Sequence, residues 1–278
     1  MRFSVILGSA ALALAGSASA QVAAPKAPHL APHRAVYDLS LANSRGARTV
    51  ESARGRIAFD FTGDACEGYA LKFRQVTVIQ SAESGTKTSD LRTANFESGD
   101  GKSFRFRNDT GSGEGASQSV DGNAERKASG PMSVRLRSPK RDNVALDGEA
   151  VFPNTQMRDL IAAARAGETT LSMKVFDGSD DGRTVYDTLS VIGKRIEPGK
   201  VDGLEAPAKQ DGLAKLARWP VSMSYFKPGK KDETPVYTLS FDLYENGVSR
   251  ALRLDYGDFA LKGEMTRLEL LPEKPCGR

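Results

Sequence analysis

The sequence is poor in the residue types that build catalytic and metal sites. Its 278 residues include only two histidines, two cysteines and one tryptophan. Both histidines, His29 and His33, lie near the N-terminus. A catalytic triad needs a base within hydrogen-bond reach of its nucleophile, and a catalytic zinc site usually needs three clustered ligands. No spacing in the sequence provides either arrangement. We therefore expect a protein that is not an enzyme and that holds no metal and no cofactor.

Long apolar runs are scarce as well. A membrane-spanning helix needs about 20 consecutive apolar residues. The only apolar stretch of note, Val5–Ala15, is shorter and is preceded by a basic residue. It is followed by Ala18 and Ala20 at the two small-residue positions of a signal-peptidase site. This order is typical of a secretory signal peptide, so we expect residues 1–20 to be removed by cleavage before Gln21.

A lipid anchor is not expected on the exported chain. A lipoprotein signal would place a cysteine directly after a triplet such as Leu14-Ala15-Gly16, but the next residue is Ser17. No later segment is long and apolar enough to span a membrane. The sequence therefore predicts a soluble protein of the periplasm without a transmembrane anchor.

A strong excess of one charge is missing too. The formal net charge is +4, and the basic residues are spread along the chain. Such a weak excess does not indicate a nucleic-acid partner. It allows loose association with anionic lipid headgroups or lipopolysaccharide, although a solvated surface of mixed charge is the simpler interpretation.

Cys66 and Cys276 are the only thiols. In an oxidising compartment an even cysteine count without a CxxC motif favours one structural disulfide over a metal site. The bond would close a loop of about 210 residues, for which the chain-entropy model gives roughly 5 kcal/mol as an upper figure. We expect it to pin the C-terminal tail onto the N-terminal third of the chain.

The mature chain is dominated by strand patterns. Residues 21–32 are rich in Ala and Pro and are interpreted as a flexible leader. From His33 onward, apolar and polar residues alternate in run after run, separated by Gly- and Ser-rich breaks. We expect about twelve to fourteen strands and one or two helices in a single β-rich domain over residues 33–278. The predicted fold is all-β: a long antiparallel meander curled into a barrel, half-barrel or spiral that covers its edges.

Several local features refine this picture. A shift of the apolar phase predicts a bulge near Arg74-Gln75. Asp121-Gly122-Asn123 has the composition of a turn, and Asn246-Gly247 lies between alternating runs as in a tight hairpin. Helical spacing after Phe152-Pro153 predicts a helix capped by Asn154 or Thr155, and the following residues contribute its apolar face and its stop: Met157, Leu160, Ile161, Ala164 and Gly167. A weaker, shorter helix is expected over residues 211–217.

Five features could carry chemistry, and each has a structural interpretation that we favour. Residues 177–182 match the first half of a calcium loop, but the twelfth position is Thr188 rather than Glu and the flanks resemble strands, which favours an acidic turn. The glycines of residues 111–115 lack the context of a phosphate-binding loop. Asp255 and Asp258 are separated by a glycine and suggest a turn more than a carboxylate pair. Trp219 is expected in the core, and His33 at a partly exposed strand start.

Three segments resemble a known family. They are HRAVYDLSL (residues 33–41), WPVSMSYF (residues 219–226) and LYENGVSR (residues 243–250), the last continuing through LDYGDF (residues 254–259). With the signal peptide and the cysteine placement, they resemble the EipB family of alphaproteobacterial cell-envelope integrity proteins. The resemblance implies a monomeric periplasmic protein with a spiral-like β-sheet and a disulfide matching Cys66 and Cys276. It also implies a role under envelope stress and supplies no catalytic motif.

Two functions remain open at this point. The first is a non-catalytic periplasmic protein that maintains envelope integrity by binding a partner protein or a lipid or peptidoglycan component. The alternative is a carrier or chaperone for a lipid, lipoprotein or cell-wall fragment, similar in shape to the carriers LolA and LolB. The sequence names no ligand-binding residue for either.

Overall fold

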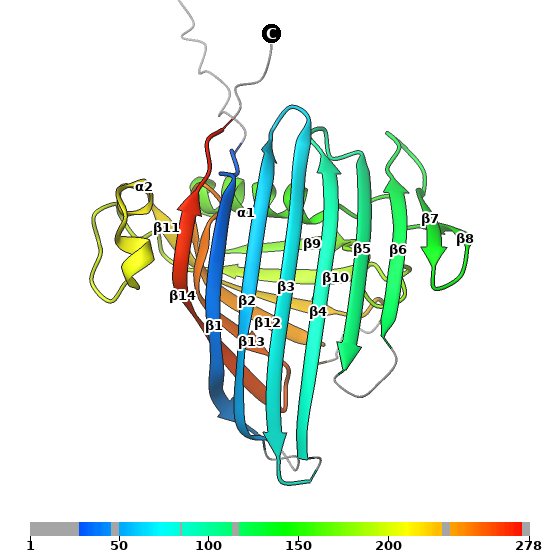
Figure 1. Ribbon diagram of the computed structural model, residues 1–278. Helices are drawn as coiled ribbons and strands as arrows, with labels where there is room; N and C mark the ends of the chain where they lie inside the picture. Colours follow the sequence, from blue (N-terminus) through cyan, green and yellow to red (C-terminus); the bar gives the residue numbers. More distant parts are fainter. Residues whose placement is uncertain (1–27, 46–49, 84, 113–116, 230–233, 274–278) are drawn as a thin grey trace, which may run out of the picture.

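The computed structural model describes residues 28–45, 50–83, 85–112, 117–229 and 234–273 (Figure 1). Fourteen strands form one antiparallel sheet in the order β8-β7-β6-β5-β4-β3-β2-β1-β14-β13-β12-β11-β10-β9. This confirms the predicted all-β meander. The strands are β1 (His33–Ser44), β2 (Val50–Asp64), β3 (Gly68–Ser81), β4 (Gly85–Ser98), β5 (Ser103–Ser112), β6 (Gln118–Glu125), β7 (Met132–Ser138), β8 (Asp142–Leu146), β9 (Thr170–Val175), β10 (Tyr186–Ile192), β11 (Arg218–Phe226), β12 (Tyr237–Tyr244), β13 (Ser249–Asp255) and β14 (Phe259–Leu270).

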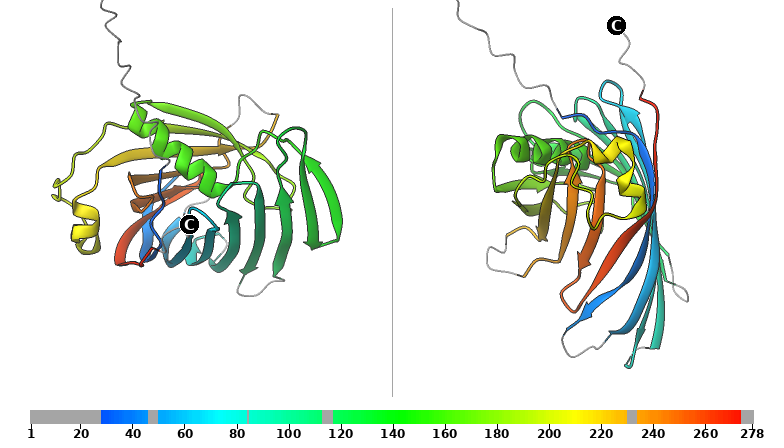
Figure 2. Two further views of the ribbon diagram at one scale, coloured as in Figure 1. Left: turned by 90° about the horizontal axis from the view of Figure 1, so that it is seen from above. Right: turned by 90° about the vertical axis from the view of Figure 1, so that its left-hand side faces the viewer.

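The order of the strands shows how the sheet curls. The first and last strands, β1 and β14, lie side by side in its middle, while β8 and β9 form its two edges. The back part, β9 to β12, passes behind β1 to β5 and crosses these strands at a steep angle (Figures 1 and 2). Helix α1 (Pro153–Ala166) connects the two edges and lies within the curl (Figure 2). One face of the sheet is therefore enclosed and the other points outward.

Strand β1 illustrates why these residues form strands. Ala35, Tyr37 and Leu39 are at most 4% exposed, whereas the residues between them face the other side. A period of two residues places every second side chain on the same face of a pleated strand. The alternation in the sequence thus decides which face of the sheet becomes the interior.

The interior is filled by three hydrophobic clusters. One joins α1 to β10, β11 and β12, and its members include Leu160, Ile161 and Trp219, which is 2% exposed. The second surrounds β1 and β14 and includes Leu213 of the short helix α2 (Asp211–Ala214). It also takes in Ala208 of the 3-10 helix η1 (Ala206–Lys209). The third lies against β5 to β7. The core position expected for Trp219 is confirmed.

Helix α1 begins differently from the prediction. Its N-cap residue is Phe152, without a side-chain cap from Asn154 or Thr155. The buried carboxylate of Glu97, on β4, instead accepts hydrogen bonds from the Asn154 N–H at 2.7 Å and the Thr155 N–H at 2.9 Å. The first N–H groups of a helix have no partner within it, so a carboxylate from elsewhere can satisfy them and complement the helix dipole. The helix ends at Ala166, and Gly167 follows in the left-handed conformation, which confirms it as the predicted stop.

Other local expectations were wrong for identifiable reasons. The register of β3 against β2 and β4 is continuous across Arg74-Gln75, so no bulge exists there. The apolar phase shifts because the interior positions are taken by Gln75 and Thr77 while Val76 points outward. Asp121-Gly122-Asn123 lies inside β6 and not in a turn. A register shift against β7 begins at Gly122, and any Cβ there would collide with the Phe106 ring.

The first described residues are tightly packed. His33 is 4% exposed rather than partly exposed, and its ring stacks on Phe59 at 5.1 Å between centroids. Leu30, which we had assigned to the leader, is 3% exposed, and the N–H of the neighbouring Ala31 donates to Asn246 at 2.8 Å. The chain is therefore held against the sheet before β1 begins.

Candidate functional site

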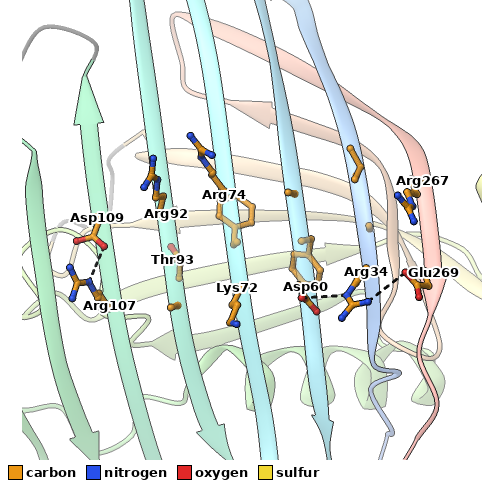
Figure 3. Close-up of a pocket in the computed structure, with 16 residues that line it drawn as sticks. Arg34, Asp60, Lys72, Arg74, Arg92, Thr93, Arg107, Asp109, Arg267 and Glu269 are labelled. Carbon is orange, nitrogen blue, oxygen red and sulfur yellow. Dashed lines mark hydrogen bonds and ion pairs between the residues drawn. The ribbon is translucent and has the colours of Figure 1, made fainter.

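A groove crosses the outward face of the sheet over β14 and β1 to β5 (Figure 3). Its volume is about 540 Å³. Long charged side chains stand along it, while its floor contains the short side chains of Val36, Ala58 and Ala94. The charged lining residues are Arg34, Asp60, Lys72, Arg74, Arg92, Arg107, Asp109, Arg267 and Glu269. Because the floor residues are small, the cations can converge on a ligand that rests between them.

Strand register arranges the lining in rows. In one row, directly paired residues run across seven strands from β14 to β6: Glu269, Arg34, Asp60, Lys72, Ala94, Arg107 and Asp121. Charges of opposite sign alternate along this row except at one position. Where the pattern calls for a carboxylate, between Lys72 and Arg107, the chain has Ala94.

The adjacent row adds further cations. It runs through Arg267, Val36, Ala58, Arg74, Arg92 and Asp109. Arg74 and Arg92 are direct cross-strand neighbours, and like charges in such a position repel each other. A single carboxylate, Asp90, compensates both arginines at 2.9 and 2.8 Å. These two guanidinium groups hold the pKa of Asp90 well below its usual range.

The remaining ion pairs do not include every cation of the groove. Arg34 bridges Asp60 and Glu269 at 3.4 and 3.7 Å, and Arg107 contacts Asp109 at 2.9 Å (Figure 3). Within the part of the chain that the structure describes, neither Lys72 nor Arg267 has a carboxylate within ion-pair distance. The groove thus retains positive charge that its own carboxylates do not balance.

The neighbourhood of Ala94 is the most positive part. On this face its eight nearest positions comprise two on β4, three on β3 and three on β5. Five of the eight are basic, one is acidic and two are apolar, namely Lys72, Arg74, Arg92, Arg105, Arg107, Asp109, Ala70 and Phe96. Arg105 lies over the Phe96 ring at 4.8 Å. We call the five basic residues around Ala94 the cation cradle; its chemistry suits an anion, since arginine pairs bidentately with phosphate and carboxylate.

The motifs that could have carried catalysis have structural roles. Asp177 and Asp181 accept hydrogen bonds from backbone N–H groups two residues ahead, each at 2.9 Å, in the connection between β9 and β10. Asp255 accepts the Gly257 N–H at 3.1 Å in the same manner. The part of the loop 111–115 beyond Ser112 lies outside the described residues. Among the described residues, no group of three or more His, Cys, Asp or Glu side chains is arranged to hold a metal ion.

The predicted export and disulfide positions lie mostly beyond the described chain. Ala18, Ala20, Gln21 and Cys276 are outside the described residues, so signal cleavage and the disulfide stay predictions. Cys66 is described, in the exposed turn between β2 and β3. None of the described helices has the length and apolar character needed to cross a membrane.

The geometry suits the predicted bridge to Cys276. Leu271, just after β14, donates its N–H to Pro32, just before β1, at 2.8 Å. The register of β1 with β2 and β14 places the end of β14 at the same end of the sheet as the β2–β3 turn (Figure 1). The last described residues of the chain therefore lie at the end of the sheet that carries Cys66.

The groove was not predicted from the sequence. Basic residues at alternate positions were visible, such as Lys72 with Arg74 and Arg105 with Arg107. Their gathering depends on the pairing of strands that lie more than 200 residues apart in the sequence, because β1 pairs with β14. Once the register is known, the outward positions of consecutive strands can be checked for alternating charge. Ala94 then stands out as the position without the expected carboxylate.

Comparison with known proteins gives a consistent answer. The profile of the family described as EipB-like matches residues 24–272. Cell envelope integrity protein EipB of Brucella abortus (strain 2308) is 37% identical over 257 residues, which is 92% of this chain and 89% of that protein. The crystal structure of a beta-barrel-like protein of a domain of unknown function from Brucella abortus has a TM-score of 0.80 at 35% identity, covering 88% of this chain and 100% of that one. This chain belongs to the EipB-like family.

Proposed function

We propose that this protein maintains the integrity of the cell envelope under stress, as a non-catalytic periplasmic protein that binds an envelope component. The observation that carries this proposal is the similarity to the cell envelope integrity protein of Brucella abortus over 92% of the chain. The predicted signal peptide would deliver the protein to the compartment where such a role is performed.

The surface of the molecule supports binding rather than catalysis. The groove on the outward face is open and lined by arginines, without a histidine or cysteine among its lining residues. Histidine is the most frequent general acid or base at neutral pH. The two histidines lie elsewhere, His33 stacked in the interior and His29 beside Glu273. An arrangement of this kind suits recognition of an anion and lacks the histidine or cysteine of a typical nucleophile–base pair.

The carrier alternative requires space for an apolar cargo. Carriers need an apolar lining beyond what the core itself consumes. The concave side is occupied by α1, whose Leu160 and Ile161 are fully buried against β10 to β12. We therefore favour recognition at the outward face over transport within the curl.

Genetic complementation tests the proposal. A strain lacking the gene should become sensitive to detergents and cell-wall antibiotics, and the full-length chain should restore resistance. A chain with Ala18→Arg and Ala20→Arg, which blocks signal processing, serves as the matched control and should restore less. Unchanged resistance of the deletion strain, or rescue by the control to the level of the native chain, would contradict the proposal.

A second measurement separates the two modes of action. Mass spectrometry of the protein purified from native envelopes at high salt would detect bound lipid. A stoichiometric lipid retained under these conditions would favour the carrier, because salt weakens surface ion pairs but not burial of acyl chains. A protein free of lipid at high salt fits recognition at the outward face.

A further inference from the structure

The row through Ala94 contains a gap in an otherwise regular charge pattern. From Glu269 to Asp121, six of seven directly paired positions are charged, and each charged neighbour pair has opposite signs. Opposite charges across strands stabilise a sheet, whereas like charges destabilise it. At Ala94 the expected carboxylate is replaced by a methyl group, although Lys72 and Arg107 flank the position on β3 and β5.

The spacing around the gap suits one anionic group. Neighbouring strands lie about 4.8 Å apart, which places the Cα atoms of Lys72 and Arg107 about 10 Å from each other across Ala94. Both side chains are long, and both residues are exposed. Figure 3 shows these two residues with Arg74 and Arg92 on the three adjacent strands. An anion above Ala94 could therefore be contacted by several cations at once.

We propose that the cation cradle binds the phosphate of an anionic phospholipid headgroup, and that the outward face of β1 to β5 thereby docks on a membrane surface. The proposal rests on the proposed function, since it names the envelope component that is bound. The bound phosphate takes the position of the carboxylate that the row lacks.

A membrane surface fits better than a free phosphate ion because of the extent of the charge. The groove spans six strands, about 24 Å across, and Arg34, Arg74, Arg92 and Arg107 each keep more than half of the side chain exposed. Viewed from the side, β1 to β4 form a tall outer face (Figure 2). A broad face with spread cations can contact several headgroups, whereas one phosphate ion would use only a small part of it.

Sedimentation with lipid vesicles tests the proposal directly. The mature chain, residues 21–278, is mixed with vesicles of phosphatidylcholine alone or of phosphatidylcholine with phosphatidylglycerol. We expect binding to the anionic vesicles only, weakening as salt is raised. Equal binding to both vesicle types, or no binding to either, would overturn the proposal.

Variants at Ala94 provide the sharpest control. Ala94→Glu supplies the missing carboxylate and should weaken binding at least about five-fold, the factor expected for one elementary charge near an anionic surface. Ala94→Gln adds nearly the same volume without charge and should bind much better than the Glu variant. Lys194→Gln removes one charge from an exposed loop position after β10 and should have little effect. Undiminished binding by Ala94→Glu, or an equal loss in Lys194→Gln, would refute a specific cradle.

The same variants give a readout that is independent of lipid. Without vesicles, Ala94→Glu should melt at a higher temperature than the native chain, because the new carboxylate completes the alternation between Lys72 and Arg107. Ala94→Gln should not show this gain. A lower melting temperature for the Glu variant than for the Gln variant would contradict the missing-carboxylate interpretation.

Two further outcomes distinguish a lipid headgroup from a free phosphate, and a failure of lipid docking from a failure of the proposed function. If inorganic phosphate stabilises the protein while anionic vesicles do not bind, the cradle is a site for a soluble phosphate and the membrane proposal fails. If Ala94→Glu loses vesicle binding but rescues the deletion strain fully, lipid docking is not the basis of the function. Failure of the native chain to rescue would instead refute the proposed function itself.

Discussion

The outward face of β1 to β5 and the outward face of β10 to β12 belong to one sheet but carry different chemistry. On the first, arginine and aspartate side chains form rows across the strands. On the second, hydroxyl groups pair instead, Ser222 with Ser240 and Ser224 with Thr238, both at 3.0 Å. Beside them Leu189 and Val191 are 38% and 51% exposed.

The inner faces of the same strands do not differ in this way. Both halves of the sheet present apolar residues to the interior, for example Tyr37 on β1 and Met223 on β11. Burial therefore fixes the inner residues throughout, while the outer residues are free to serve binding. The hydroxyl pairs of β11 and β12 thus contrast with the charged rows of β1 to β5, and this contrast supports the proposal that those rows serve binding.

The largest expected effect on stability comes from the predicted bond between the C-terminal tail and the turn that joins β2 and β3. Removal of the predicted Cys66–Cys276 disulfide should cost up to about 5 kcal/mol of unfolding free energy, because a loop of about 210 residues is released. Cys66→Ser, Cys276→Ser and the double variant should be destabilised equally in urea unfolding. Additive losses in the double variant would show that the two cysteines do not share a bond.

A smaller loss of stability is expected when the contact between β4 and the start of α1 is removed. Glu97→Ala removes a buried carboxylate and leaves the N–H groups of Asn154 and Thr155 without their partner. The cost should be about 3 kcal/mol, as for a charge-assisted hydrogen bond whose buried partners stay unsatisfied. Glu97→Gln retains an acceptor oxygen and should cost less. Equal stability of the Ala variant and the native chain would show that α1 does not depend on β4.

The burial of His33 on the inner face predicts that stability depends on pH. Burial lowers the pKa of His33 below its ordinary value of 6.5, against the opposing effects of the Ala31 carbonyl and Asp60. The folded state disfavours the protonated ring, so the unfolded chain binds more protons below about pH 6.5. This residue should therefore reduce stability as the pH falls from 6.5 through its folded pKa. His33→Phe preserves the stacking on Phe59 and should flatten that part of the curve in thermal melts at several pH values; an unchanged slope would contradict this origin.

The smallest expected effect tests whether the charged rows stabilise the fold. Asp90→Asn removes the carboxylate shared by Arg74 and Arg92. Exposed ion pairs contribute little in water, so the melting temperature should fall only slightly and less than in Glu97→Ala. Because the variant leaves two neighbouring arginines uncompensated, its binding to anionic vesicles should become tighter. A large loss of stability would show that the rows are structural after all.

The sequence was sufficient for features that depend on local pattern. Alternation located the strands, Asn246-Gly247 located the hairpin between β12 and β13, and Gly167 located the end of α1. These signals lie within a few residues of the structure that they specify. Such local signals predicted the fold class and most elements.

Features that depend on contacts between distant parts of the chain could not be predicted from the sequence. Glu97 caps α1 from 57 residues away in the hydrogen bond to Asn154. The apolar shift at Val76 suggested a bulge because sequence alone does not reveal which face of β3 is enclosed. The cation cradle requires the register of three strands, and the whole groove requires β14 to lie beside β1. The candidate site became visible only when the outward positions were aligned across the sheet.

Labelling of lysine side chains tests the central claim most directly, because it compares the two regions within one sample. The mature chain is treated with an amine-reactive reagent with and without phosphatidylglycerol vesicles, and modified peptides are quantified by mass spectrometry. We expect vesicles to protect Lys72, in the cradle on β3, while the exposed Lys194 beyond β10 stays equally reactive. Equal protection of both lysines, or protection of Lys194 alone, would contradict a membrane-docking site on the outward face of β1 to β5.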